Sequence, residues 1–486
     1  MAIKTKSNST VEGIDIEDAL ASVREQLDCD ATMSPALRAS IEMLILVVSL
    51  LANRFNLNSK NSSKPPASDP NRLKPVRRKS NKKPGGQPGH RGVTLMPFDE
   101  PDVIESLCID RRTLPRGNYT DAGFESRQVV DIDFVRIVTE YRAQVLIDER
   151  GQRFVAAFPD SVIRPIQYGD QIKAHAVYLS QFQLLPYQRI QDYFHDQWGI
   201  PLSAGSVVNF NTQCAARIIE SGAANLIQQK LRESDVLHVD ETGININATR
   251  HWLHCAANQQ WTHYSAHAKR GTEAMQAAGI IPEFRGVLCH DHWKPYYTYD
   301  QCQHSLCNAH HLRELERAFE QDQQGWAKKM QTLLKSINQA VIEQDGVLPK
   351  EMVQKYRRKY RYLLKQGDIE CPPPDEGERI PGKRGRLKRS KSRSLLERLR
   401  QYEDDVLRFM TLAAVAFTNN LGENDIRMTK VQQKISGCFR SMDGAATFCQ
   451  IRGYLSTCRK QQVSASEALR LLYAGRLPGF FEEGAE

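Results

Sequence analysis

The stretch VLHVDETG, residues 236–243, begins with apolar and β-branched residues and ends on two acids, a threonine and a glycine. This pattern predicts a half-buried strand. A carboxylate at the end of such a strand is costly to desolvate unless it finds a partner. We therefore expect a strand that ends at Asp240, with either solvent or a cation beyond it. In the alternative interpretation, Asp240 or Glu241 caps the turn after the strand.

The elements downstream of this strand predict a sheet that brings a second acid close to the first. They are a hairpin over 251–257 and 261–267, a helix near 272–279, a strand ending at Asp291, a strand within 304–310 and a long helix from 310. Ribonuclease-H-like nuclease domains have this topology, and their first and fourth strands are neighbours. Neighbouring strands lie about 5 Å apart, so we expect Asp240 and Asp291 to meet. Asp291 could also be a surface residue in a His-rich loop.

A third acid comes from a predicted helix within residues 417–441. Glu423, Arg427, Lys430 and Lys434 fall at helical offsets that place them on one face. Three converging carboxylates suit hard cations such as Mg²⁺. Two such ions about 4 Å apart can activate the attacking oxygen and stabilise the leaving oxygen of a phosphodiester displacement. The three cations of this face would then contact flanking phosphates.

Glu423 also has a structural interpretation. Asn420 followed three residues later by Glu423 has the form of a helix capping box. Glu423 with Arg427 would be an ordinary helical ion pair worth about 0.2–0.5 kcal/mol. These alternatives stay open on the sequence alone.

The net charge of +9 is concentrated in one segment. Residues 60–91 hold ten Lys or Arg against one acid, and the remaining basic and acidic residues balance. Low hydrophobicity with repeated Pro and Gly predicts disorder in the free protein. Such an arm suits a polyphosphate, because each neutralised phosphate releases counterions; a solvated linker is the alternative. The candidate DNA contacts in the arm are Arg77, Arg78, Lys79, Lys82 and Lys83.

The domain organisation follows from changes in pattern along the chain. Helices are predicted over 14–27 and 35–57, and the second has an apolar stripe at spacings of three and four that either self-associates or packs within the chain: Leu37, Ile41, Leu44, Val48 and Leu51. The predicted domains are N-terminal helices (1–58), the basic arm (59–97), a small β-rich module (98–168), a helix-turn-helix-like DNA-binding region (169–230), the catalytic domain (231–445) and a helical tail (446–486).

Two of these regions carry additional signals. In the helix-turn-helix-like region, Gly199 and Pro201 break a helix and Ser203 is a predicted N-cap for the next one. The catalytic domain contains a mostly helical insertion at about 320–416, which includes a basic run at 383–393 with seven Lys or Arg. The overall fold class is therefore α/β, with a ribonuclease-H-like mixed-sheet core and a helical insertion.

Cysteine usage and hydropathy predict a cytoplasmic protein that has no membrane partner. Eleven cysteines are scattered without a CxxC motif, which indicates reduced thiols. The longest apolar run, at 43–51, is shorter than the roughly 20 residues of a membrane span. Cys307 and His310 could supply half of a zinc site, but no second pair has the usual spacing. We therefore expect no zinc, and a structural role for both residues.

The sequence resembles transposases of the insertion-sequence-66 family over roughly residues 55–445. The matching segments are NSSKPPASDP, GGQPGHRG, VDETG (239–243), DHWKPYY (291–297), CNAHHLREL (307–315) and NNLGENDIRMTKVQQKISGCFRS (419–441). The cysteine-rich zinc module of many members is absent, since only Cys108 falls in the corresponding segment.

This resemblance implies that Asp240, Asp291 and Glu423 are a catalytic triad that binds two Mg²⁺ ions, for which Mn²⁺ can substitute. It implies cleavage at insertion-sequence ends and strand transfer into target DNA. The expected partners are terminal-repeat and target DNA, further copies of the chain, and accessory proteins of the same element. A nuclease without strand transfer and a non-catalytic DNA-binding regulator are the alternatives.

Overall fold

The computed structural model divides the chain into two compact units. One comprises Met1–Arg72, Val162–Phe194 and Pro201–Glu486, and the other comprises Leu73–Ser161 and His195–Ile200. The residues that the structure describes are 10–11, 14–29, 32–55, 57–58, 60–62, 97–120, 124–132, 135–375, 387 and 389–483. The arm residues Arg77, Arg78, Lys79, Lys82 and Lys83 lie outside them.

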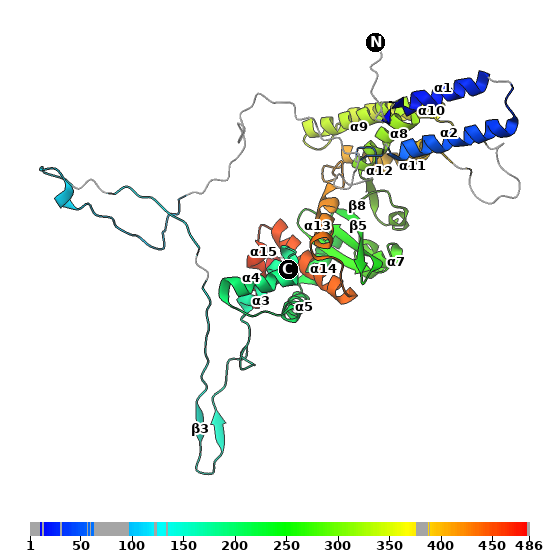
Figure 1. Ribbon diagram of the computed structural model, residues 1–486. Helices are drawn as coiled ribbons and strands as arrows, with labels where there is room; N and C mark the ends of the chain where they lie inside the picture. The colour runs from blue at the N-terminus through cyan, green and yellow to red at the C-terminus, as the bar shows by residue number, and fades with distance from the viewer. Residues whose placement is uncertain are drawn as a thin grey trace. The chain divides into compact units, whose positions relative to one another are not determined.

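A five-stranded mixed sheet lies at the centre of the larger unit (Figure 1). Its order is β7-β6-β5-β8-β9, so the predicted neighbourhood of the first and fourth strands is confirmed. The first three strands pair antiparallel, and β8 and β9 run parallel to β5. The strands are β5 (Val236–Ile246), β6 (Thr249–Ala257), β7 (Thr262–His267), β8 (Val287–His290) and β9 (Gln303–Leu306).

Strand β5 is longer than predicted, because it does not end at Asp240 but continues to Ile246. Its parallel partner β8 ends at His290, while the antiparallel partner β6 follows β5 up to Ile246. The distal half of β5 is therefore one arm of a hairpin. Ile244 and Ile246 anchor this arm because both are buried in an apolar cluster with Ile426.

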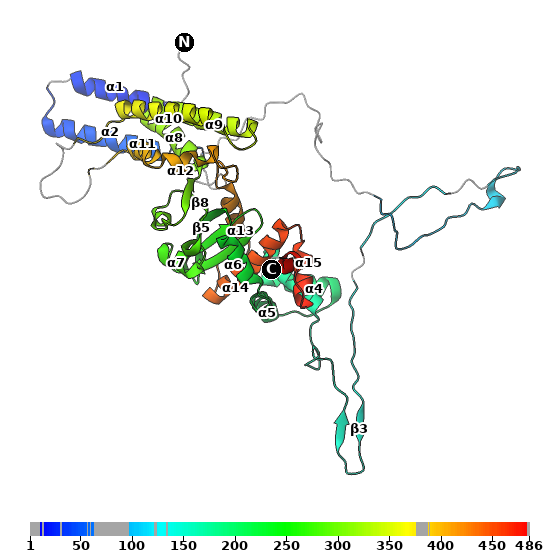
Figure 2. The same ribbon diagram turned by 180° about the vertical axis from the view of Figure 1, so that it is seen from behind.

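Helices α13 (Asn420–Ser436) and α14 (Met442–Lys460) cover one face of the sheet, and both views show α14 beside the strands (Figures 1 and 2). Helix α14 packs on β7 and on α5 (Ala204–Glu220), and α15 (Ala465–Tyr473) packs on α14; the short helix α16 (Phe480–Glu483) follows. The predicted boundary at 445 falls inside α14. The C-terminal helices are thus part of the core and not a separate tail.

The predicted insertion is helical and is continuous with the sheet. Trp326 and Tyr360 from the insertion are fully buried in the same cluster as Val287 of β8 and Leu306 of β9. In the described part of the basic run, Arg393 forms ion pairs with Asp368 and Glu397. The helices are α8 (Asn308–Asp322), α9 (Gly325–Glu343), α10 (Lys350–Glu370), α11 (Lys391–Gln401) and α12 (Glu403–Leu407); α7 (Thr272–Ala278) precedes β8.

The region predicted to resemble a helix-turn-helix is helical, and the predicted cap is confirmed. Ser203 Oγ accepts the Ser206 N–H at 3.0 Å at the start of α5. The buried face of α5 packs on α3, α14 and α15. Its single arginine, Arg217, donates to backbone carbonyls at Leu472 and Tyr473, so the exposed face of α5 carries no basic side chain. The other helices here are α3 (Asp170–Val177), α4 (Tyr187–Trp198) and α6 (Ala223–Arg232).

The two N-terminal helices were predicted and are present as α1 (Ile16–Cys29) and α2 (Pro35–Phe55). Buried side chains Leu27 and Ile45 belong to α1 and α2, but most of the apolar surface of α2 is exposed. By length and composition alone, the segment Pro35–Ala52 could cross a membrane. It is longer than the apolar run at 43–51 considered in the sequence, because α2 continues through the polar residues Ser40 and Glu42 that precede this run.

The smaller unit contains much less strand than its alternating sequence predicts. Its regular strands, among the residues described there, are β3 (Val145–Ile147) and β4 (Arg153–Val155), which pair antiparallel. Both are exposed at every position. Alternation alone does not make a sheet, because each strand needs a partner and a covering layer to bury its apolar face.

Candidate functional site

The sheet register brings Asp240 and Asp291 to the same level on neighbouring strands. The pairs Val236↔Val287 and His238↔Cys289 define the alignment of β5 with β8. Two residues beyond the second pair, this register leads to Asp240 on β5 and to Asp291, which directly follows β8. Side chains two positions apart on a strand point to the same face. The two carboxylates therefore lie together where β8 leaves the sheet.

The surroundings of Asp240 disfavour the charged form of its carboxyl group. Burial raises its pKa to about 8, and the charges of Glu241, Asp291 and Glu423 add to the rise. The backbone N–H of Glu241 donates to Asp240 Oδ1 at 2.9 Å and opposes the rise. No Lys or Arg forms an ion pair with Asp240 or Asp291, both of which lie in the described part of the chain. The site has excess negative charge that a cation would offset.

Glu423 reaches this site because Asn419 ties the start of α13 to β5. The Asn419 Nδ2 donates to the carbonyl of Val239 at 2.8 Å, and its Oδ1 lies 2.8 Å from His238 Nδ1. Both contacts are with residues directly before Asp240. Glu423 follows one helical turn later, so the third carboxylate comes close to the first.

The capping-box interpretation of Asn420 and Glu423 is wrong. Asn420 is exposed and is the first residue of α13, and the cap position belongs to Asn419 without a side-chain cap bond. The Asn419 side chain is already used to hold β5. Glu423 also forms no ion pair with Arg427 among these described residues. Its carboxylate is directed elsewhere.

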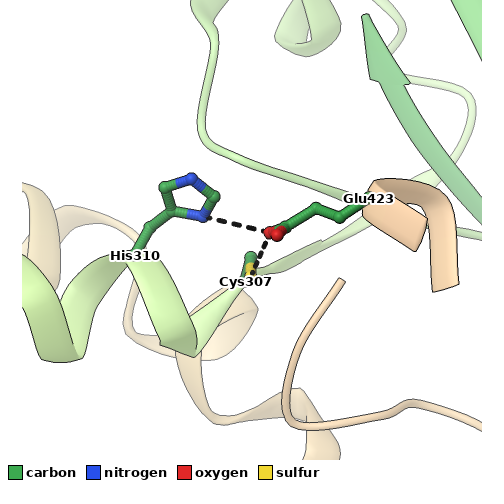
Figure 3. A group of neighbouring side chains, drawn as sticks. All are labelled: Cys307, His310 and Glu423. Atoms are coloured by element: carbon green, nitrogen blue, oxygen red, sulfur yellow. Dashed lines mark hydrogen bonds and ion pairs between the residues drawn. The ribbon is translucent and has the colours of Figure 1, made fainter. Parts of the chain in front are cut away.

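Glu423 contacts the Cys307 and His310 side chains (Figure 3). The Cys307 thiol donates to Glu423 Oε1 at 3.7 Å, and His310 Nδ1 lies 3.8 Å from the same oxygen. Burial raises the pKa of Cys307 to about 11 and lowers the pKa of His310. The sequence predicted structural roles for both residues, and the structure shows that their partner is the candidate catalytic acid.

The Glu241 carboxylate differs from that of Asp240, because cationic and hydroxyl side chains donate hydrogen bonds to it. Arg270 donates two hydrogen bonds to Glu241 Oε1, at 2.9 and 2.5 Å, and the Tyr296 hydroxyl donates to Oε2. Arg270 also stacks on Trp293, 4.1 Å from the ring centre, and the backbone N–H of Trp293 donates to Asp291 Oδ1 at 2.9 Å. This network links β5 to the loop that carries Asp291. Glu241 therefore positions the site, whereas Asp240 has an available carboxylate.

The three basic side chains of α13 are exposed, and one of them also bonds to the sheet. Arg427 and Lys434 are exposed. Lys430 donates to the carbonyl of Gly243 at 2.8 Å, next to the extended half of β5. Arg427 and Lys434 are thus available to an anionic ligand, while Lys430 also joins α13 to the sheet.

Arg398 was not identified from the sequence and reaches toward the site from α11 of the insertion. It forms an ion pair with Glu314, and its buried Nε makes no hydrogen bond within the described structure. Burial lowers the pKa of Arg398, and the charges of Tyr297 and Asp291 oppose this. No local pattern could have revealed Arg398, because more than 100 residues separate it from Asp291 in the chain.

The fold and the site define an α/β protein with a carboxylate-rich centre next to exposed basic side chains. The model of the Transposase IS66 family matches residues 165–447, more than half of the chain, and the chain belongs to this family. Membership indicates a transposase that binds DNA and takes part in its processing. A family of unknown function (DUF6444) matches residues 8–95. No curated protein matches the chain.

Proposed function

We propose that this transposase cleaves one strand at the insertion-sequence end and joins the freed 3′ hydroxyl to target DNA. Asp240, Asp291 and Glu423 act as the catalytic carboxylates of a ribonuclease-H-like domain. The observation that carries the proposal is the shared register of Asp240 and Asp291, together with the charges of Asp291 and Glu423 acting on Asp240.

The donor set fits Mg²⁺, because three carboxylates that form no ion pair with a Lys or Arg of the described residues offer hard oxygen ligands. Asp240 and Asp291 would hold both ions between them, and Glu423 would complete one site; Mn²⁺ would substitute. A bound pair of such ions activates the attacking oxygen and stabilises the leaving oxygen. The protein's own residues orient these ligands: Asn419 holds α13 against β5, and the pair of Glu241 with Arg270 holds the loop of Asp291.

DNA binding uses the exposed cations. Arg427 and Lys434 contact phosphates next to the scissile bond, with Lys430 between them, and the arm residues 59–97 neutralise phosphates further away. Self-association through the apolar stripe of α2 would pair two element ends in one complex. Accessory proteins of the same element and a cytoplasmic location complete the proposal.

The test is the substitution Glu423→Gln in an assay with DNA that bears the terminal repeats and with Mg²⁺ or Mn²⁺. Cleavage should fall by at least about a thousandfold, because the neutral amide is a much weaker Mg²⁺ ligand than the carboxylate, while DNA binding is retained. Nicking without strand joining in the wild type would indicate a nuclease. Binding without either reaction, under conditions that include accessory proteins, would indicate a regulator. Retained cleavage by Glu423→Gln would contradict the role of this residue.

A further inference from the structure

Three side chains of different chemistry meet beside the carboxylate site. One ligand atom each from Cys307, His310 and Glu423 lies within 4.8 Å of the other two (Figure 3). The Sγ–Oε1 separation is 3.7 Å and the Nδ1–Oε1 separation is 3.8 Å. Tetrahedral zinc with ordinary Zn–S, Zn–N and Zn–O bonds requires separations of about 3.3–3.6 Å between ligand atoms. Small side-chain movements would be sufficient to close the site on an ion.

Rigid elements carry all three ligands. Cys307 directly follows β9 and occupies the N-cap position of α8, and His310 lies in the first turn of that helix. Glu423 lies in the first turn of α13, which Asn419 anchors to β5. A site on helices and strands is held more precisely than one on loops. The approach of the ligands is therefore set by the fold and not by side-chain mobility.

The surroundings of the ligands also suit an ion. The Asn419 backbone N–H donates to Cys307 Sγ at 3.2 Å, a contact that stabilises a thiolate. His310 Nδ1 is buried and makes no hydrogen bond within the described structure, so this nitrogen can coordinate an ion in the tautomer that carries the proton on Nε2. The His310 and Glu423 side chains keep exposures of 25% and 21%, which leaves a path for an ion and for a water in the fourth position.

We propose that Cys307, His310 and Glu423 bind one thiophilic divalent cation, with Zn²⁺ as the best match. Sulfur and nitrogen ligands select Zn²⁺ over Mg²⁺, which prefers oxygen alone. On binding, the Cys307 thiol loses its proton to the solvent and the sulfur coordinates the ion. This revises the expectation of no zinc: the fold supplies the missing ligand from a position 116 residues away.

Such an ion would control the enzyme, an inference that rests on the proposed function. Glu423 cannot coordinate Zn²⁺ and a catalytic Mg²⁺ equally well at the same time, because both ions would share one carboxylate. Zn²⁺ at this site therefore withdraws Glu423 from the Asp240–Asp291 pair. We infer that zinc inhibits cleavage at millimolar Mg²⁺.

The binding test uses Co²⁺ as a probe for the zinc site in the full-length protein under reducing conditions. Wild-type protein should develop one equivalent of a thiolate-to-cobalt charge-transfer band, which added Zn²⁺ removes. Cys307→Ser should lose the band. His310→Gln, which alters a partly exposed side chain, should bind Co²⁺ more weakly by more than about tenfold. Cys438→Ser, which changes an exposed cysteine outside the group, should retain the band.

The activity test measures cleavage with Mg²⁺ and increasing Zn²⁺. Wild type should be inhibited, and His310→Gln should require at least tenfold more Zn²⁺. Absence of the band in wild type, or its persistence in Cys307→Ser, would overturn the site. A normal band in a protein without cleavage activity would support the site and would count against the proposed function alone. Equal inhibition of wild type and His310→Gln would overturn the inhibitory role.

Discussion

Asp240 is a carboxyl group in surroundings that penalise its charge. Its pKa is about 8 against an ordinary value of 3.8, mainly because of burial and then because of neighbouring carboxylates. Between these two values the metal-free folded protein binds a proton that the unfolded chain releases. The stability contributed by this group is therefore complete below about pH 4 and is lost as the pH rises toward 8.

Replacing Asp240 with Asn should remove this part of the pH dependence. In urea titrations with a chelator present, the wild-type midpoint should fall from pH 4 to pH 8 more steeply than that of Asp240→Asn, and the variant should be more stable at pH 8. Comparison of the two proteins cancels the contributions of other buried acids. Parallel pH profiles would show that Asp240 is not protonated in the folded protein.

Tyr296 stabilises a second buried acid, because its hydroxyl donates a hydrogen bond to the Glu241 carboxylate. Tyr296→Phe would leave Glu241 Oε2 without this donor. We expect a loss of about 1–3 kcal/mol in the free energy of unfolding, measured by denaturant titration. The matched control, Tyr362→Phe on the exposed side of α10, should change it by less than about 0.5 kcal/mol. Equal effects of the two substitutions would mean that the Glu241 network contributes little.

At the scale of elements, α13 combines two tasks that substitution can separate. Arg427→Ala and Lys434→Ala should each weaken DNA binding and lower the slope of log K against log salt by about one, without loss of stability. Lys430→Met should in addition reduce the free energy of unfolding by about 1 kcal/mol, because it removes the bond to Gly243. Lys391→Ala, on the exposed surface of α11, is the control and should leave the salt slope unchanged. An unchanged salt slope in all three variants of α13 would place the DNA elsewhere.

Several elements of the sheet could be predicted from local patterns, and this success has a physical basis. Strand β8 and the hairpin of β6 and β7 have alternating or continuous apolar sequences bounded by turn residues, which local propensity identifies. The extension of β5 to Ile246 could not be predicted, because Ile244 and Ile246 are stabilised by Ile426, far away in the chain. The same holds for the pairs of Glu241 with Arg270 and of Cys307 with Glu423. Such contacts depend on the tertiary arrangement.

At the scale of the whole molecule, the exposed face of α2 predicts an assembly. Leu37, Leu44 and Leu51 recur every seven residues and are 52%, 61% and 48% exposed. Ile41 and Val48 fall between them at the alternate core position. Leucine at d with β-branched residues at a favours a parallel two-stranded coiled coil. We therefore expect a dimer of the full chain.

Sedimentation analysis should give a dimer for wild type and a monomer for Leu44→Asp at the same concentration. Met43→Asp, which is equally exposed but lies off the stripe, should remain dimeric. The membrane alternative for Pro35–Ala52 gives a different outcome, in which a monomer binds to lipid vesicles. A monomeric wild type would contradict the dimer directly.

The apolar cluster shared by the insertion and the strands limits how the molecule could be dissected. Val287 and Leu306 of the sheet are buried by helices that the chain inserts between Asp291 and Glu423. Excision of those helices would expose Val287 and Leu306 to water and would remove the packing behind β8, the strand that precedes Asp291. The insertion is therefore not a detachable accessory. A shorter version of this protein would need another apolar layer over β8 and β9 in place of these helices.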